Sequence, residues 1–131
     1  MTVAKISIVC QGCYTVLTPG SNFLYTFGVL GNACIAMCLL CEDRCGLAHV
    51  DTVTSLDYVT FMVNEVRGKG SDATLQCVLL GSNPSLAAQV ASIMAMHATV
   101  VDLTSPVGFS SLSVIVKPRE VLSYEGNAIA L

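Results

Sequence analysis

One short segment of the chain holds most of the residues that could do chemistry, namely Cys34, Cys38, Cys41, Cys45 and His49. A cysteine thiolate can bind a metal ion or attack an electrophilic carbon, and an imidazole can ligate the same metal or take the thiol proton. Free cysteines also pack in protein cores as small hydrophobic residues. Which of these three roles applies depends on the elements that position the segment.

The sequence predicts strands and helices that follow one another along a single domain, residues 1–131. Extended or apolar runs predict strands at Val3–Val9, Phe23–Val29, Cys34–Leu40, Gly46–Val50, Thr74–Leu80, Thr99–Leu103 and Leu112–Lys117. Apolar residues spaced by three and four predict helices at Leu56–Arg67, with Ser55 as N-cap, and at Ser85–His97. The expected fold class is a layered α/β (α+β) sandwich, with mixed or antiparallel β-sheets and about two helices packed on them. The tail Ser123–Leu131 is ambiguous.

Composition excludes several function classes. Hydrophobic residues make up 53% of the chain and charged residues 11%, with a net charge of −3 and six scattered Lys and Arg. Without a basic stripe, we expect no nucleic-acid partner. The best apolar stretch, Ala33–Leu40, is far shorter than the roughly 20 residues that span a bilayer, so we expect no membrane association. Seven cysteines and no secretion signal favour free thiols in a reducing compartment.

The polar stretch from Cys41 to Cys45 separates two apolar runs and therefore predicts a β-hairpin. In a hairpin the chain around His49 returns beside the chain around Cys34, so a thiol and an imidazole far apart in sequence can meet. A metal site fits less well, because on a helix the cysteine face would extend too far for one ion. For Cys10, Cys13, Cys38, Cys41 and Cys77, which lie in apolar runs, we expect core packing. His97, at the end of the second predicted helix, is expected to be structural, where a cation suits the helix dipole.

The motifs Leu30-Gly31-Asn32-Ala33-Cys34-Ile35-Ala36-Met37-Cys38 and Gly46-Leu47-Ala48-His49 resemble the signature of the CheD chemoreceptor glutamine deamidases. The match is close over these motifs, and the order of the later elements follows the family loosely. Asn32-Ala33 stands where the family has a single Ser. A wider group of toxin deamidases, including cytotoxic necrotizing factor and Burkholderia lethal factor, has a similar Cys/His arrangement.

This resemblance implies a cysteine-dependent amidohydrolase that converts Gln to Glu on a bacterial protein partner. Cys34 would be the nucleophile, His49 the general base and acid, and Thr26 the residue that orients His49. Backbone N–H groups at Asn32, Ala33 and Cys34 would bind the oxyanion, and neither a metal nor another cofactor is expected. The substrate would be an exposed Gln or Asn, and a regulatory protein partner fits this class.

The resemblance places the protein in the bacterial cytoplasm, in chemotaxis, or in a target-cell cytosol as a secreted effector. Two alternatives stay open: a non-catalytic protein-binding module of the same fold, and a Cys/His metal-binding protein.

Overall fold

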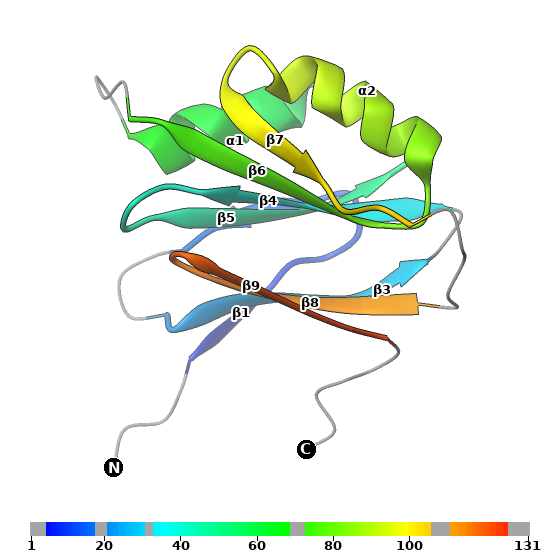
Figure 1. The fold of residues 1–131 in the computed structure, drawn as a ribbon. Coiled ribbons are helices and arrows are strands. Elements are labelled where there is room, and N and C mark those ends of the chain that lie inside the picture. The colour runs from blue at the N-terminus through cyan, green and yellow to red at the C-terminus, as the bar shows by residue number, and fades with distance from the viewer. Residues whose placement is uncertain (1–4, 18–20, 31–32, 69–72, 106–110, 126–131) are drawn as a thin grey trace.

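The chain folds into two stacked β-sheets with helices on one outer face (Figure 1). The computed structural model describes residues 5–17, 21–30, 33–68, 73–105 and 111–125. In these ranges the elements are β1 (Ile6–Ile8), β2 (Tyr14–Val16), β3 (Phe23–Leu30), β4 (Cys34–Leu40), β5 (Cys45–Asp51), α1 (Tyr58–Arg67), β6 (Leu75–Gly81), α2 (Pro84–Met94), β7 (Ala98–Asp102), β8 (Ser111–Lys117) and β9 (Glu120–Glu125).

The five-stranded sheet, in the order β2-β5-β4-β6-β7, is the middle layer of the molecule (Figure 1). Its central strands β4 and β5 form an antiparallel hairpin, closed by a hydrogen bond from the Cys41 N–H to the Arg44 C=O at 2.9 Å. All seven residues of β5 are buried, as are six of the seven in β4. A strand covered on both faces needs apolar residues at nearly every position, which explains the unbroken run of β4.

Both helices pack on the outer face of this sheet (Figure 1). Helix α1 buries Val59, Met62, Val63 and Val66, which share one face at helical spacing. The N-cap is Asp57 and not the expected Ser55, whose hydroxyl instead accepts a hydrogen bond from the Asp57 N–H at 3.4 Å. Helix α2 begins at Pro84, a position whose N–H would have no partner within the helix, so proline loses no hydrogen bond there. The Asn83 side chain caps the helix by accepting a hydrogen bond from the Leu86 N–H.

The four-stranded sheet, in the order β1-β3-β8-β9, covers the inner face of the middle layer and encloses a second apolar core (Figure 1). A β-bulge interrupts its β3–β8 pairing: Thr26 pairs with Val114, but the next pair is Val29 with Leu112. Gly28 has a φ of +65° in the bulge, a backbone conformation that residues with a Cβ rarely adopt. The extra residue turns both Thr26 and Val29 inward.

The observed architecture confirms the expected fold class of mixed β-sheets with two helices, and also the hairpin at residues 34–51. Two short strands, β2 and β9, were not predicted. The expectation that Cys10 and Cys13 are buried in the core is wrong, because both are exposed. Among the described residues, no helix is long and apolar enough to cross a membrane.

Candidate active site

Three polar side chains lie in or beside the core between the two sheets. They are Thr26, fully buried, His49, 2% exposed, and Asp51, 5% exposed. Because a buried polar group is unfavourable unless it is hydrogen-bonded, each of these side chains requires partners. Their partners therefore define what the site can do.

Thr26 and His49 meet across the gap between the sheets. Thr26 lies on β3 of the outer sheet and His49 on β5 of the middle sheet, and Thr26 Oγ1 is 2.8 Å from His49 Nδ1. The same hydroxyl donates its single hydrogen to the Val9 C=O at 2.8 Å. Thr26 Oγ1 must therefore accept from an Nδ1–H, which fixes the tautomer of the ring.

The other ring nitrogen, His49 Nε2, is buried and has no hydrogen-bond partner among the described residues. In the tautomer that Thr26 selects, Nε2 carries a lone pair. The ring is thus held at one side by Thr26 and presents a proton acceptor at the other. This is the arrangement that a general base requires.

The hairpin register places Cys34 on the same face as His49. Cys34 pairs with Asp51, and Ala36 pairs with His49. Both backbone groups of His49 bond away from β4, because the Gly12 N–H donates to the His49 C=O at 2.8 Å and the His49 N–H donates to the Cys13 C=O at 3.0 Å. The Ala36–His49 pair is therefore of the non-hydrogen-bonded type, and so is the Cys34–Asp51 pair two residues along.

In such a ladder, Cys34 and His49 are diagonal neighbours on one face. Diagonal positions lie about 7–8 Å apart between Cα atoms, which is within reach of side chains that point toward each other. Cys34 and His49 therefore face the same inter-sheet core, and no hydrogen bond joins the Cys34 thiol to His49 Nε2 in the described part of the chain.

Burial keeps both groups neutral. It lowers the pKa of His49 below its usual 6.5, although the charge of Asp51 opposes this effect. Burial likewise raises the pKa of Cys34 above its usual 9.0; a backbone hydrogen bond from Leu30 lowers it, and the charge of Asp51 raises it further. At neutral pH the resting pair is thus a thiol beside an uncharged imidazole, not an ion pair.

Asp51 is a site residue that the sequence analysis did not single out. Its carboxylate accepts from the Thr54 N–H at 2.7 Å, the Val53 N–H at 3.2 Å and Gln11 Nε2 at 3.1 Å. Burial favours the protonated acid, but these hydrogen bonds outweigh it and hold the pKa of Asp51 below its usual value. The sequence could have indicated Asp51, because residues two apart in a strand face the same side and Asp51 lies two residues after His49.

The expected oxyanion donors are only partly supported. Asn32 lies outside the described residues. The Ala33 N–H is already engaged, since it donates to the Leu30 C=O at 3.2 Å in the turn before β4. Ala33 therefore cannot serve without a change in this turn, and the Asn32 and Cys34 N–H groups stay predictions.

The remaining cysteines have different surroundings. Cys38, Cys45 and Cys77 are buried, and burial raises the pKa of Cys45 to about 11 and of Cys77 to about 12. Among the residues that the structure describes, no three His, Cys, Asp or Glu side chains cluster closely enough to hold a metal ion.

Helix α2 ends at Met94, so His97 does not lie in its last turn, where the helix dipole was expected to favour a cation. The His97 C=O accepts a hydrogen bond from Arg67 Nη2 at 2.8 Å. A structural role for the His97 side chain stays a prediction.

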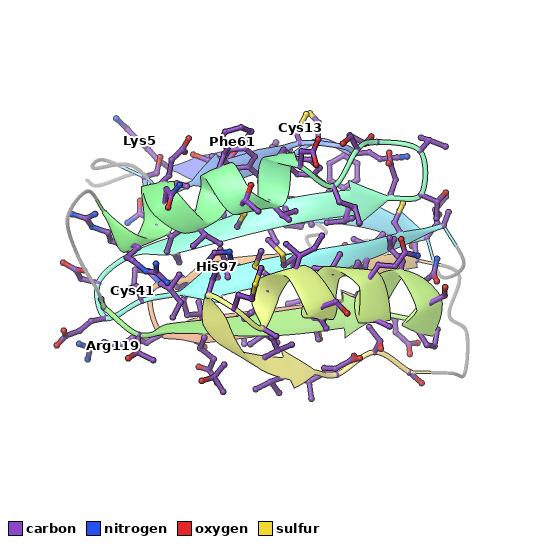
Figure 2. All side chains as sticks on the ribbon, turned by 90° about the horizontal axis from the view of Figure 1, so that it is seen from above. Lys5, Cys13, Cys41, Phe61, His97 and Arg119 are labelled. Atoms are coloured by element: carbon purple, nitrogen blue, oxygen red, sulfur yellow. The ribbon has the colours of Figure 1, made fainter. Side chains whose placement is uncertain are left out.

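The cluster is closed to solvent, with Cys34 fully buried. A surface cavity of about 440 Å³ lies instead at the far end of β4, six residues from Cys34, where Leu40, Cys41 and Arg119 are among its lining residues. Figure 2 shows Cys41 and Arg119 together at that end. Neither Cys34 nor His49 lines this cavity.

No protein-family profile matches the sequence, and no curated protein sequence matches it significantly.

Proposed function

We propose that the protein is a cysteine-dependent amidohydrolase that deamidates side-chain carboxamides on a protein partner, converting Gln to Glu. One observation carries the proposal: Thr26 fixes His49 with an unpartnered Nε2 on the same face of the β4–β5 hairpin as Cys34. The resemblance of the Cys34 and His49 motifs to CheD deamidases supports the same chemistry.

In the first half of the reaction, His49 Nε2 takes the proton from Cys34 Sγ as the sulfur attacks the carboxamide carbon. The Cys34 N–H stabilises the oxyanion that forms. The imidazolium then returns its proton to the amide nitrogen, the C–N bond breaks, and ammonia leaves a thioester on Cys34.

In the second half, a water molecule attacks the thioester carbon while His49 Nε2 takes its proton. The C–S bond breaks, the imidazolium protonates the sulfur, and the carboxylic acid product leaves. Thr26 positions the ring throughout. The lowered pKa of His49 keeps the base uncharged, and therefore competent, above pH 6.5. No step needs a metal or another cofactor.

The carboxylate of Asp51, on the same face, stabilises each imidazolium as it forms. Asp51 also disfavours binding of an anionic product, since like charges in a buried site repel. The substrate class is therefore a neutral carboxamide, with protein Gln preferred on the motif resemblance and with Asn or a small amide as the alternatives that the experiment separates.

The test is mass spectrometry of candidate partner proteins after incubation with the wild type, Cys34→Ala, or Cys45→Ala. The wild type and Cys45→Ala should convert a specific Gln to Glu and release ammonia in equal amount. Cys34→Ala should do neither. Equal conversion by Cys34→Ala would contradict the proposal, as would conversion of free glutamine or Asn peptides in preference to protein Gln.

A non-catalytic protein-binding module is the second candidate, because the Cys34 thiol is fully buried and His49 is only 2% exposed. In this role both residues would be core groups. Cys34→Ala would then bind partner proteins as tightly as the wild type and have the same biological effect, whereas the amidohydrolase requires the effect to be lost while binding persists.

A further inference from the structure

Two cysteines outside the proposed catalytic cluster form a second chemical feature. Cys10 and Cys13 are exposed, whereas four of the other cysteines are buried and Cys41 is half-buried. Figure 2 shows the labelled Cys13 side chain at the outer edge of the molecule, on the side of α1. All seven thiols are free in this structure, so a reagent in solution reaches this pair before the buried thiols.

The backbone brings the two residues together in a tight turn. The Cys13 N–H donates to the Cys10 C=O at 3.1 Å. Gly12, the third residue of the turn, has a φ of +77°, the positive φ that a type II turn requires at this position. A four-residue turn holds its first and last Cα atoms within about 7 Å. A disulfide spans about 4.4–6.8 Å between Cα atoms, so the turn already has the required span.

This turn is attached to the strand that carries His49. The Gly12 N–H and the Cys13 C=O bond to the two backbone groups of His49, and Gln11 bonds to the Asp51 carboxylate. The turn also packs closely on the loop after β5, since a Cβ added at Gly12 would lie 2.9 Å from Thr54 Oγ1. Any constraint on the turn is therefore transmitted to the backbone of His49.

We propose that Cys10 and Cys13 form a reversible disulfide by exchange with a small-molecule disulfide such as oxidised glutathione. One thiolate attacks the small disulfide, forming a mixed disulfide and releasing one thiol. The second protein thiolate then attacks the protein sulfur of that mixed disulfide and releases the second thiol. In total the pair gives up two hydrogens, and the small disulfide is reduced to two thiols. The disulfide fixes the turn on β5, and this proposal does not depend on the proposed deamidase activity.

The first test equilibrates the full chain with glutathione buffers of increasing oxidising strength, followed by acid quenching, alkylation and mass spectrometry. The peptide that contains Cys10 and Cys13 should lose two hydrogens, and a reducing buffer should restore them. Cys10→Ser and Cys13→Ser should carry one glutathione each, while Cys41→Ser should behave as the wild type. Glutathione on both cysteines, a disulfide between two chains, or no oxidation at any buffer composition would overturn the proposal.

The second test measures the coupling to β5 by hydrogen exchange. The amides of Gly12 and His49 should exchange about tenfold more slowly in the oxidised protein, because both donate to partners across the constrained turn. The amides of α2, which packs toward the β7 edge of the middle sheet, opposite the β2 edge, should not change. Unchanged exchange at Gly12 and His49 in a fully oxidised sample would contradict the transmission to His49.

Discussion

At the scale of single residues, the defining feature is the unpartnered nitrogen of His49. A buried acceptor without a hydrogen bond destabilises the folded state by about 1–3 kcal/mol. Native structures have few such groups, and a catalytic role is one explanation for them. Among the described residues, Tyr58 Oη and Arg67 Nε are also buried without a partner. The Val9 C=O takes the hydroxyl hydrogen of Thr26, so Thr26 Oγ1 accepts from the Nδ1–H of His49. This leaves Nε2 as the proton acceptor for the proposed reaction.

Replacing Thr26 tests this arrangement. Thr26→Val keeps the shape but removes the hydroxyl, so the Val9 C=O and the His49 ring each lose a buried partner. We expect a loss of about 1–3 kcal/mol in the free energy of unfolding, measured by urea titration, and a fall in deamidation rate of about 10²-fold as the tautomer is released. Thr26→Ser, which keeps the hydroxyl, should retain most of the stability and most of the deamidation rate. Equal losses in Thr26→Val and Thr26→Ser would show that the hydroxyl does not position His49.

The lowered pKa of His49 predicts a pH dependence of stability. Below the usual pKa of 6.5 the unfolded chain binds a proton that the folded chain does not, so stability should fall as the pH decreases through 6.5. Asp51 acts separately: its pKa is lowered from 3.8, so its stabilisation is lost only as the pH falls further, below 3.8. Urea titrations across this range should give two distinct losses.

The variant His49→Gln isolates the first loss. It removes the titrating ring and should flatten the stability profile near pH 6.5 while leaving the loss below pH 3.8. A wild-type profile that is flat near pH 6.5, or a variant with the same slope as the wild type, would show that His49 is not buried as a neutral ring.

The sequence alone identified some of these residues and not others. Cys34 and His49 could be predicted because their motifs are local and their hairpin is closed by a short polar loop. The exposure of Cys10 and Cys13 could not, because their apolar neighbours suggest a core strand and the turn depends on pairing with β5. Asp51 was missed because its partners Gln11 and Thr54 come from two other segments.

At the scale of elements, the β-bulge in β3 follows Thr26 and changes which face of the strand the residues after it occupy. Without the extra residue, Thr26 and Val29 could not both face the inter-sheet core, since successive side chains alternate. Gly28 allows the bulge because its φ of +65° is unfavourable for other residues. The bulge thus adds Val29 to the inter-sheet core on the same face as Thr26.

Substitution at Gly28 tests the backbone strain in the bulge. A Cβ at this position meets nothing within 4 Å, so any destabilisation comes from the backbone alone. Gly28→Val should lower the free energy of unfolding by about 1–2 kcal/mol, and Gly28→Asn, which tolerates positive φ, should cost less. Both values follow from urea titration. Asn as damaging as Val would mean that backbone strain is not the cause.

The elements themselves were predictable to different degrees. The strands β4 and β6 have long apolar runs, and α1 and α2 have apolar residues at helical spacing. For these elements the local sequence pattern matches the faces that the fold buries, so they could be predicted. The strand β2 has only three residues, and β9 contains two Glu and only partly buried apolar residues, so neither has a strong pattern. Both are edge strands whose formation depends on a partner strand elsewhere in the chain.

At the scale of the whole molecule, three layers place the site. The helices and the outer sheet cover both faces of the β4–β5 hairpin, so Cys34 and His49 lie in a dry core instead of a surface cleft (Figure 1). Exclusion of water strengthens each charge interaction during the proposed reaction. It also buries the Cys34 thiol, so in the proposed reaction substrate binding would have to be coupled to opening at the end of the sandwich.

Chloroacetamide labelling tests whether the two residues work as a pair, because this reagent combines a carboxamide with a carbon that thiols attack. Cys45 is the internal control, since it is equally buried in the same core. In the native protein, Cys34 should be alkylated faster than Cys45, and His49→Gln should slow Cys34 to the rate of Cys45. Equal rates for the two cysteines in the wild type, or a Cys34 rate that His49→Gln leaves unchanged, would contradict a nucleophile and base acting together.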